Sequence, residues 1–154
     1  MGRARQMKLD DALQGVSRLA FDTAPIIYFV EANPTYDKLV TNIFNRVAAG
    51  ELEGWTSVIS LSEVLVQPIH SNRTDLQKQY RDLLLNSANF HTFPITADVA
   101  ERAAQFRGTY GFRLPDAIQI AFAINAGCDA IVCNDRGMQR ITEIRVLLLD
   151  ELEL

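Results

Sequence analysis

The chain has 154 residues, of which 48% are hydrophobic and 22% are charged. This length fits one globular domain, and this hydrophobic content excludes an intrinsically disordered chain. With 15 basic and 19 acidic side chains the net charge is −4 at pH 7, which argues against a protein that coats nucleic acid through a basic surface.

The cysteine content and the chain ends indicate a cellular setting. Two cysteines, Cys128 and Cys133, are too few for a disulfide framework and favour a reducing compartment. Residues 1–17 are polar and unlike a signal peptide, and the most apolar segment, 117–126, is too short to span a bilayer. We therefore expect a cytoplasmic protein that does not enter a membrane. Residues 1–17 are expected to form a loose or short helical extension, and 150–154 an acidic tail.

Five short apolar segments along the chain have the character of buried strands. The first ends at Asp22, and a turn at 50–54 precedes the second. Each segment is followed by turn residues or by the start of a helical pattern. The predicted strands are 19–21, 55–59, 90–95, 129–133 and 145–149.

Between these strands, apolar residues recur at intervals of three and four, which predicts helices. Pro68 is expected to end one of them, whereas Pro115 begins another that stops at Gly127. Strands and helices thus alternate, which predicts an α/β fold with a mostly parallel sheet of about five strands covered by helices on both faces. The predicted helices are 23–30, 36–49, 60–67, 74–86, 96–110 and 115–126.

Four acidic residues fall at strand ends or helix starts. Asp22 closes the first strand and Asp135 follows the fourth, while Glu63 and Asp116 lie in the first turns of helices. Ligands of open α/β sheets bind beyond the carboxyl ends of the strands, so these four side chains could converge on one rim. Clustered carboxylates repel one another, and a hard divalent cation such as Mg²⁺ or Mn²⁺ relieves that repulsion.

Each of these residues also fits a purely structural role. Asp22 suits a helix N-cap, and Glu63 suits a capping box that begins at Ser60. Asp116 suits the positive end of a helix dipole, and Asp135 suits a turn. The spacing alone leaves both interpretations open.

Other chemistries have less support. The sequence has neither a glycine-rich phosphate loop nor a nucleophile elbow. His70 and His91 are interpreted as structural or exposed side chains. Arg113 and Arg136 flank the carboxylates and can meet either a phosphate or solvent.

Several motifs resemble those of PIN-domain nucleases. Phe-Asp-Thr-Ala-Pro-Ile-Ile-Tyr at 21–28 resembles the opening motif of that family, and Ser-Leu-Ser-Glu-Val at 60–64 resembles its second acidic motif. The segments 113–123 and 127–138 are similar to the third and fourth motifs, in order and at the right separation. The resemblance covers 18–149, implies a PIN-like three-layer sandwich there, and suits the small VapC-type toxins.

The resemblance implies a metal-dependent endoribonuclease. Asp22, Glu63, Asp116 and Asp135 would bind Mg²⁺ or Mn²⁺, and Thr23 would support the first of them by hydrogen bonding. It also implies a homodimer, and an antitoxin partner whose C-terminal segment brings a basic side chain into the acidic pocket. Apart from the four carboxylates the domain is slightly basic, so RNA binding would depend on bound cations and on arginines near the rim.

One departure from the family pattern keeps an alternative open. Cys133 stands two residues before the last aspartate, where Thr or Ser is common, and this removes a hydroxyl donor near Asp135 that Asn134 would have to replace. The alternative function is therefore a PIN-like module that binds RNA or protein without cutting. A haloacid-dehalogenase-type phosphatase fits less well, because Ala24 stands where that site needs a second aspartate.

Overall fold

A five-stranded parallel sheet forms the centre of the protein. The computed structural model describes residues 6–154. The strands lie in the order β4-β3-β2-β5-β6, and all neighbours are parallel, as the sequence predicts. They are β2 (Arg18–Phe21), β3 (Glu53–Ser57), β4 (Phe90–Phe93), β5 (Ala130–Cys133) and β6 (Arg145–Leu148).

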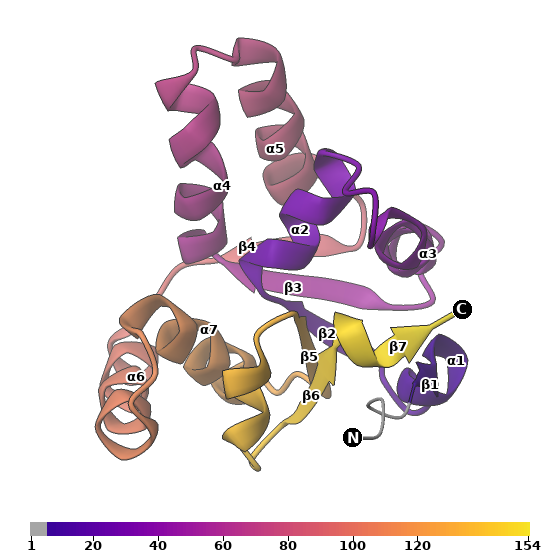
Figure 1. Ribbon diagram of the computed structural model, residues 1–154. Coiled ribbons are helices and arrows are strands. Elements are labelled where there is room, and N and C mark those ends of the chain that lie inside the picture. Colours follow the sequence, from indigo (N-terminus) through magenta and orange to yellow (C-terminus); the bar gives the residue numbers. More distant parts are fainter. Residues whose placement is uncertain (1–5) are drawn as a thin grey trace.

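Helices cover both faces of this sheet and complete a three-layer α/β sandwich (Figure 1). One layer contains α2 (Thr23–Val30), α3 (Asp37–Ala48), α4 (Val58–His70) and α5 (Thr74–Asn86). The other contains α6 (Ala97–Tyr110) and α7 (Leu114–Asn125), with the short 3₁₀ helix η1 (Arg136–Arg140) nearby. No helix among residues 6–154 is long and apolar enough to cross a membrane.

Strand β2 from Leu19 onward and the whole of β5 are apolar because both of their faces are buried. In β2, Leu19 and Phe21 pack into the core between the sheet and helices α2 and α3. Ala20 packs into the core on the opposite face, between the sheet and helices α6 and α7. Residues of β5 alternate between the two cores in the same way. Parallel strands buried on both sides read as continuous apolar runs, which explains why the sequence locates them well.

The second strand differs from its prediction at both ends. It begins at Glu53, so Gly54 belongs to the strand and not to the predicted turn, and it ends at Ser57. A Cβ atom on Gly54 would lie 2.6 Å from the ring of Phe90, so only glycine admits this ring beside β3. The aromatic packing around Phe21 and Phe90 therefore determines a strand residue that reads as a turn residue in the sequence.

Helix α4 also continues past its predicted end. Pro68 lies inside the helix, which ends only at His70. A proline in a last turn sacrifices one backbone hydrogen bond, and here its ring is buried against the core. The proline ring is therefore buried inside the helix, and the helix continues for two residues after it.

The two ends of the described chain pack together and join the core. β1 (Met7–Lys8) pairs in parallel with β7 (Leu152–Glu153), next to α1 (Leu9–Ala12) and the 3₁₀ helix η2 (Leu149–Glu151). Leu9 and Leu152 are both buried. Within residues 6–17 the helix α1 agrees with the short helical form of the predicted extension, and this segment and the acidic residues 150–154 are packed against the domain; residues 1–5 lie outside the described part. Apolar side chains on both segments explain this packing.

Candidate active site

The candidate site lies where the order of strands reverses. The chain proceeds outward from β2 to β3 and β4, then crosses over and returns as β5 on the other side of β2. A crevice at the carboxyl ends of the strands forms at such a switch point. Asp22 directly follows β2, and its backbone amide donates to the carbonyl of Val132 in β5 at 3.0 Å. Asp135 follows β5 by two residues, so both aspartates belong to this crevice.

Helices bring the other two carboxylates to the same place. Glu63 lies in the second turn of α4, and Asp116 is the third residue of α7. The charges of Asp116, Glu63 and Asp135 all act on the ionisation of Asp22. The structure therefore brings the four predicted side chains into one electrostatic cluster.

Asp22 is the most deeply buried member of this cluster, with only 8% of its surface exposed. Burial raises the pKa of its carboxyl to about 7, repulsion by the three neighbouring carboxylates adds to the rise, and the backbone amide of Thr23 opposes it. Asp22 occupies the N-cap position of α2, yet its side chain makes no capping hydrogen bond. The N-cap interpretation is therefore right about the position of Asp22 in the chain, but the carboxylate of Asp22 does not cap the helix.

Thr23 supports two of the carboxylates. Its backbone amide bonds to Asp22, in line with the resemblance, and its hydroxyl donates to Oε1 of Glu63 at 2.8 Å. The capping-box interpretation of Glu63 is wrong, because the N-cap of α4 is Ser57 and Ser60 lies inside the helix. Glu63 is therefore free of a capping role and is held by a residue from α2.

Asp116 has a basic partner within the cluster. The guanidinium Nε of Arg113 donates to Oδ2 of Asp116 at 3.2 Å, and this bond raises the pKa of Arg113. The Arg113 side chain is 79% exposed, so it can leave Asp116 at little cost in packing. The crevice thus holds one mobile positive charge beside its four acidic groups.

Asp135 is held by the turn that follows it. Its Oδ1 accepts a hydrogen bond from the backbone amide of Gly137 at 2.8 Å, which caps η1 and agrees with the turn interpretation. The buried thiol of Cys133 lies 3.9 Å from the backbone carbonyl of Asp135, and burial raises the pKa of this thiol to about 12. Asn134 contacts Tyr28 and Asp150 instead. The support of Asp135 therefore comes from a backbone amide, and neither Cys133 nor Asn134 replaces the missing hydroxyl.

A buried polar network below the crevice was missed from the sequence. Ser57, Ser60 and Thr56 of β3 and α4 bond to one another or to Gln119 of α7, and all four side chains are buried. The available signal was a glutamine, Gln119, inside the most apolar segment of the chain.

The donor set fits a hard divalent cation in its chemistry. All four donors are carboxylates, the ligand type that Mg²⁺ and Mn²⁺ prefer, and a buried Asp22 with a raised pKa gains most from a nearby cation. Within residues 6–154, however, no three His, Cys, Asp or Glu side chains lie close enough together to hold an ion. Binding an ion here therefore requires the exposed carboxylates to move toward Asp22.

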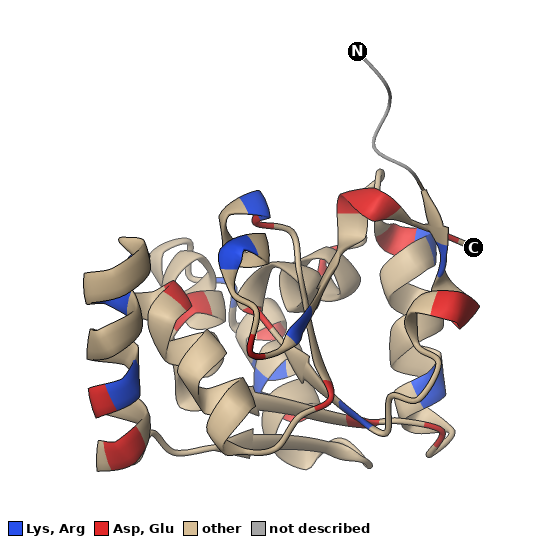
Figure 2. Ribbon diagram, turned by 90° about the horizontal axis from the view of Figure 1, so that it is seen from below, with Lys and Arg blue, Asp and Glu red and all other residues tan. Residues whose placement is uncertain are grey.

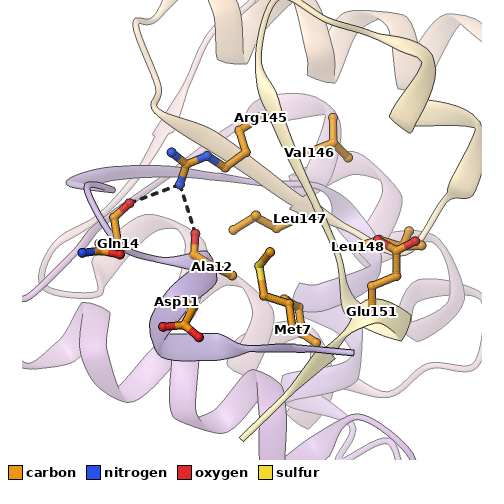
Figure 3. A pocket seen from close by; sticks show the side chains of 10 residues that line it. Met7, Asp11, Ala12, Gln14, Arg145, Val146, Leu147, Leu148 and Glu151 are labelled. Carbon is orange, nitrogen blue, oxygen red and sulfur yellow. Dashed lines mark hydrogen bonds between the residues drawn. The ribbon is translucent and has the colours of Figure 1, made fainter. Parts of the chain in front are cut away.

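A cavity among the described residues lies away from these carboxylates. It has a volume of about 480 Å³ and lies between β6 and the terminal segments, where Arg145 donates to the carbonyls of Ala12 and Gln14 (Figure 3). None of the four carboxylates lines it. Basic and acidic residues are interspersed over the ribbon (Figure 2), in keeping with the absence of a strongly basic charge balance.

Three solved structures share this fold. The VapBC2 complex of Rickettsia felis, bound to a DNA fragment from its promoter, matches with a TM-score of 0.67 and 16% identity over 84% of this chain and 96% of the other. A toxin-antitoxin complex from Klebsiella pneumoniae matches with a TM-score of 0.66 and 22% identity over 85% and 97%. VapC20 of Mycobacterium tuberculosis, a sarcin-ricin loop cleaving toxin, matches with a TM-score of 0.66 and 16% identity over 82% and 98%.

A comparison with curated proteins finds no match. The PIN domain family, by contrast, matches residues 19–144, which include all four carboxylates. The strand order, the acidic cluster and this match agree, and the chain belongs to the PIN domain family.

Proposed function

We propose that this protein is an endoribonuclease that depends on Mg²⁺ or Mn²⁺ and serves as the toxin of a toxin-antitoxin pair. The observation that carries the proposal is the buried carboxylate of Asp22, which lies at the switch point of the sheet among three further carboxylates. Membership in the PIN family and the fold shared with VapC toxins support it.

Asp22, Glu63, Asp116 and Asp135 would hold the cation. A bound divalent cation supplies charge neutralisation at the scissile phosphate and a water of lowered pKa. Thr23 keeps the Glu63 carboxylate in place, and the amide of Gly137 does the same for Asp135. When a cation replaces it beside Asp116, Arg113 becomes available to bind a phosphate oxygen of the RNA backbone.

The test is cleavage of structured RNAs by the purified chain. We expect cleavage with Mg²⁺ or Mn²⁺, none with EDTA, and none by an Asp116→Asn variant. Asp98→Asn is the matched control, because Asp98 is also an acidic residue in the first turn of a helix, on α6. Cleavage that persists in EDTA or in Asp116→Asn contradicts the mechanism, and cleavage of DNA hairpins alone contradicts the substrate class.

An antitoxin partner follows from the charge of the crevice. Four carboxylates, of which Asp116 is paired with Arg113, attract a basic side chain from another protein, which would occupy the place of the cation. We expect a cognate antitoxin to inhibit cleavage, and excess Mn²⁺ to weaken that inhibition. An antitoxin that binds equally well to wild type and to Asp22→Asn/Asp116→Asn would show that it recognises another surface.

A homodimer is part of the same proposal. Val66 and Ile69 lie on one face of α4 with 58% and 56% of their surfaces exposed, and a second copy of the chain would cover them. Light scattering of the wild type should give twice the chain mass, and Val66→Glu should give the single mass.

We also propose a cytoplasmic location for the protein. The free cysteines Cys128 and Cys133 support it, because free thiols are typical of a reducing compartment.

A second candidate function is a binding module that does not cut. The pairing of Arg113 with Asp116 favours it, because an acidic site compensated by an arginine has less need of an ion. Calorimetry with Mn²⁺ separates the two functions. Binding at micromolar to millimolar Mn²⁺ supports the nuclease, and the absence of any binding in this range supports the module.

A further inference from the structure

Gln119 lies below the candidate site and is almost completely buried, with 2% of its surface exposed. It is one turn beyond Asp116 on α7, on a helix whose other buried residues are small or apolar. Its Oε1 accepts a hydrogen bond from the hydroxyl of Ser57 at 2.6 Å, and its Nε2 donates to Oγ of Ser60 at 2.6 Å. One side chain thus links α7 to the end of β3 and to the first turn of α4.

Each hydroxyl group has one hydrogen to donate, and this determines which group donates in each hydrogen bond of the network. Glu63 and the carbonyl of Phe21 can only accept, so the hydroxyls of Thr23 and Thr56 donate to them, at 2.8 and 2.9 Å respectively. Oγ of Ser60 lies 3.1 Å from the oxygen of Thr23 and 2.9 Å from that of Thr56, so Ser60 donates its own hydrogen to one of these two. The amide of Gln119 satisfies the acceptor side of Ser60.

The network joins the three elements that carry Asp22, Glu63 and Asp116. Its serine, threonine and glutamine side chains are buried, and buried polar groups cost free energy unless they are paired. A fully paired buried network fixes one arrangement of the elements that contribute to it. An apolar residue in place of Gln119 would take away the acceptor of the Ser57 hydroxyl and one donor to Ser60 Oγ, and with them both side-chain hydrogen bonds that join α7 to the start of α4.

We propose that Gln119 is a positioning residue of the candidate site, which acts through Ser60 and Thr23 on the carboxylate of Glu63. The proposal rests on the proposed function for its consequence, since Glu63 is there a ligand of the cation. Side chains that orient metal ligands without touching the metal typically change metal affinity or activity by about 10- to 100-fold when they are mutated. We expect an effect at the lower end of this range, because Gln119 acts over two intervening hydroxyls.

Gln119→Met tests the proposal, since methionine keeps the length of the side chain and removes both hydrogen bonds. In the metal-free protein, we expect the NMR signals of the Thr23 methyl group and the Glu63 side chain to shift. Calorimetry should give about tenfold weaker Mn²⁺ binding. Ile120→Val, an equally buried change on the same helix, should leave the signals and the Mn²⁺ affinity as in wild type. Ser60→Ala removes the same link with less change in volume, and serves if Gln119→Met does not fold.

A double variant separates positioning from simple stabilisation. Thr23→Val cuts the path between Ser60 and Glu63, so Gln119→Met should cause no further loss of Mn²⁺ affinity in that background, although it still lowers the melting temperature. Unchanged Thr23 and Glu63 signals in Gln119→Met, or an equal loss of affinity in both backgrounds, would overturn the proposal. If wild type binds no Mn²⁺, the proposed nuclease fails, and the NMR signals alone still decide whether Gln119 positions Glu63.

Discussion

Asp129 and Asp22 lie at opposite ends of the neighbouring strands β5 and β2, and their surroundings affect their carboxylates in opposite ways. Asp129 precedes β5, is exposed, and accepts hydrogen bonds from the backbone amides of Ser17 and Arg18, both at 2.9 Å. These bonds lower its pKa. Asp22 follows β2 at the other end of the sheet, is buried, makes no capping hydrogen bond, and has a pKa raised to about 7. The first aspartate stabilises the fold, whereas the second is kept in an unfavourable state that a cation would relieve.

The largest expected difference between these two residues is in cleavage. Asp22→Asn should lower the rate of RNA cleavage by about 10²- to 10³-fold, because charge stabilisation at a reacting centre is worth several kcal/mol. Asp129→Asn, which keeps an acceptor oxygen at the far end of the sheet, should retain most of the activity. Initial rates at saturating Mg²⁺ measure both. Equal losses in the two variants would remove the functional distinction drawn above.

The two aspartates should also give opposite pH profiles of stability. Because the folded pKa of Asp22 lies above the ordinary value of 3.8, its contribution to metal-free stability is full below about pH 4 and is lost as pH rises to about 7. Metal-free Asp22→Asn should therefore be more stable than wild type at pH 8 by a few kcal/mol, since a tenfold change in an ionisation constant corresponds to about 1.4 kcal/mol. Urea denaturation at pH 4.5 and pH 8 measures the difference. A gain of the same size at both pH values would contradict the raised pKa.

Removing the structural aspartate should have a moderate effect on folding. Asp129→Ala deprives two backbone amides of their acceptor, so we expect a loss of about 1–2 kcal/mol in the free energy of unfolding at pH 7. The pKa of Asp129 is lowered in the fold, so its contribution is present above pH 4 and fades in acid. The loss in Asp129→Ala should accordingly shrink between pH 5 and pH 3. A constant loss over this range would assign the effect to packing.

The smallest effect is expected at the turn that holds Asp135. A Cβ atom on Gly137 would lie 3.1 Å from Oδ1 of Asp135, which is tighter than an ordinary contact. Gly137→Ala should therefore displace this carboxylate by a few tenths of an ångström and lower kcat/KM a few-fold, with little change in the melting temperature. Gly108→Ala is the matched control, because a Cβ there meets nothing within 4 Å. An unchanged kcat/KM in Gly137→Ala would show that cleavage tolerates a small displacement of the Asp135 carboxylate.

Elements with a local sequence pattern could be predicted from the sequence. Elements whose structure depends on contacts with residues far away in the chain could not. The strand at 130–133 is a continuous apolar segment, and the helix at 114–125 is a mostly apolar segment with Pro115 near its start and Gly127 after its end; both were predicted to within a residue or two. The two-residue strands β1 and β7 exist only through each other, and the strand character of Gly54 depends on a ring 36 residues away. Neither fact has a local signature.

The candidate site shows the same division. The four carboxylates were found because each follows a strand or begins a helix within a family motif, and the fold brings them into one cluster. Their hydrogen-bond partners were not found, because Thr23 bonds to Glu63 and Ser60 to Gln119 across distances of 40 and 59 residues in the chain. Which neighbour a hydroxyl chooses is a property of the packed structure.

The reversal of strand order at β2 has a consequence for the synthesis of the protein. Asp22 and Glu63 belong to the first half of the chain, whereas Asp116 and the strand that pairs with the far side of β2 come from the last third. A growing chain that has been released only as far as β4 lacks two of the four carboxylates, Asp116 and Asp135, and the strand on the far side of β2. If the proposed activity is correct, a nascent chain stays harmless to the RNA around it until β5 has emerged and docked, so the ribosome that makes the protein is protected for most of its translation.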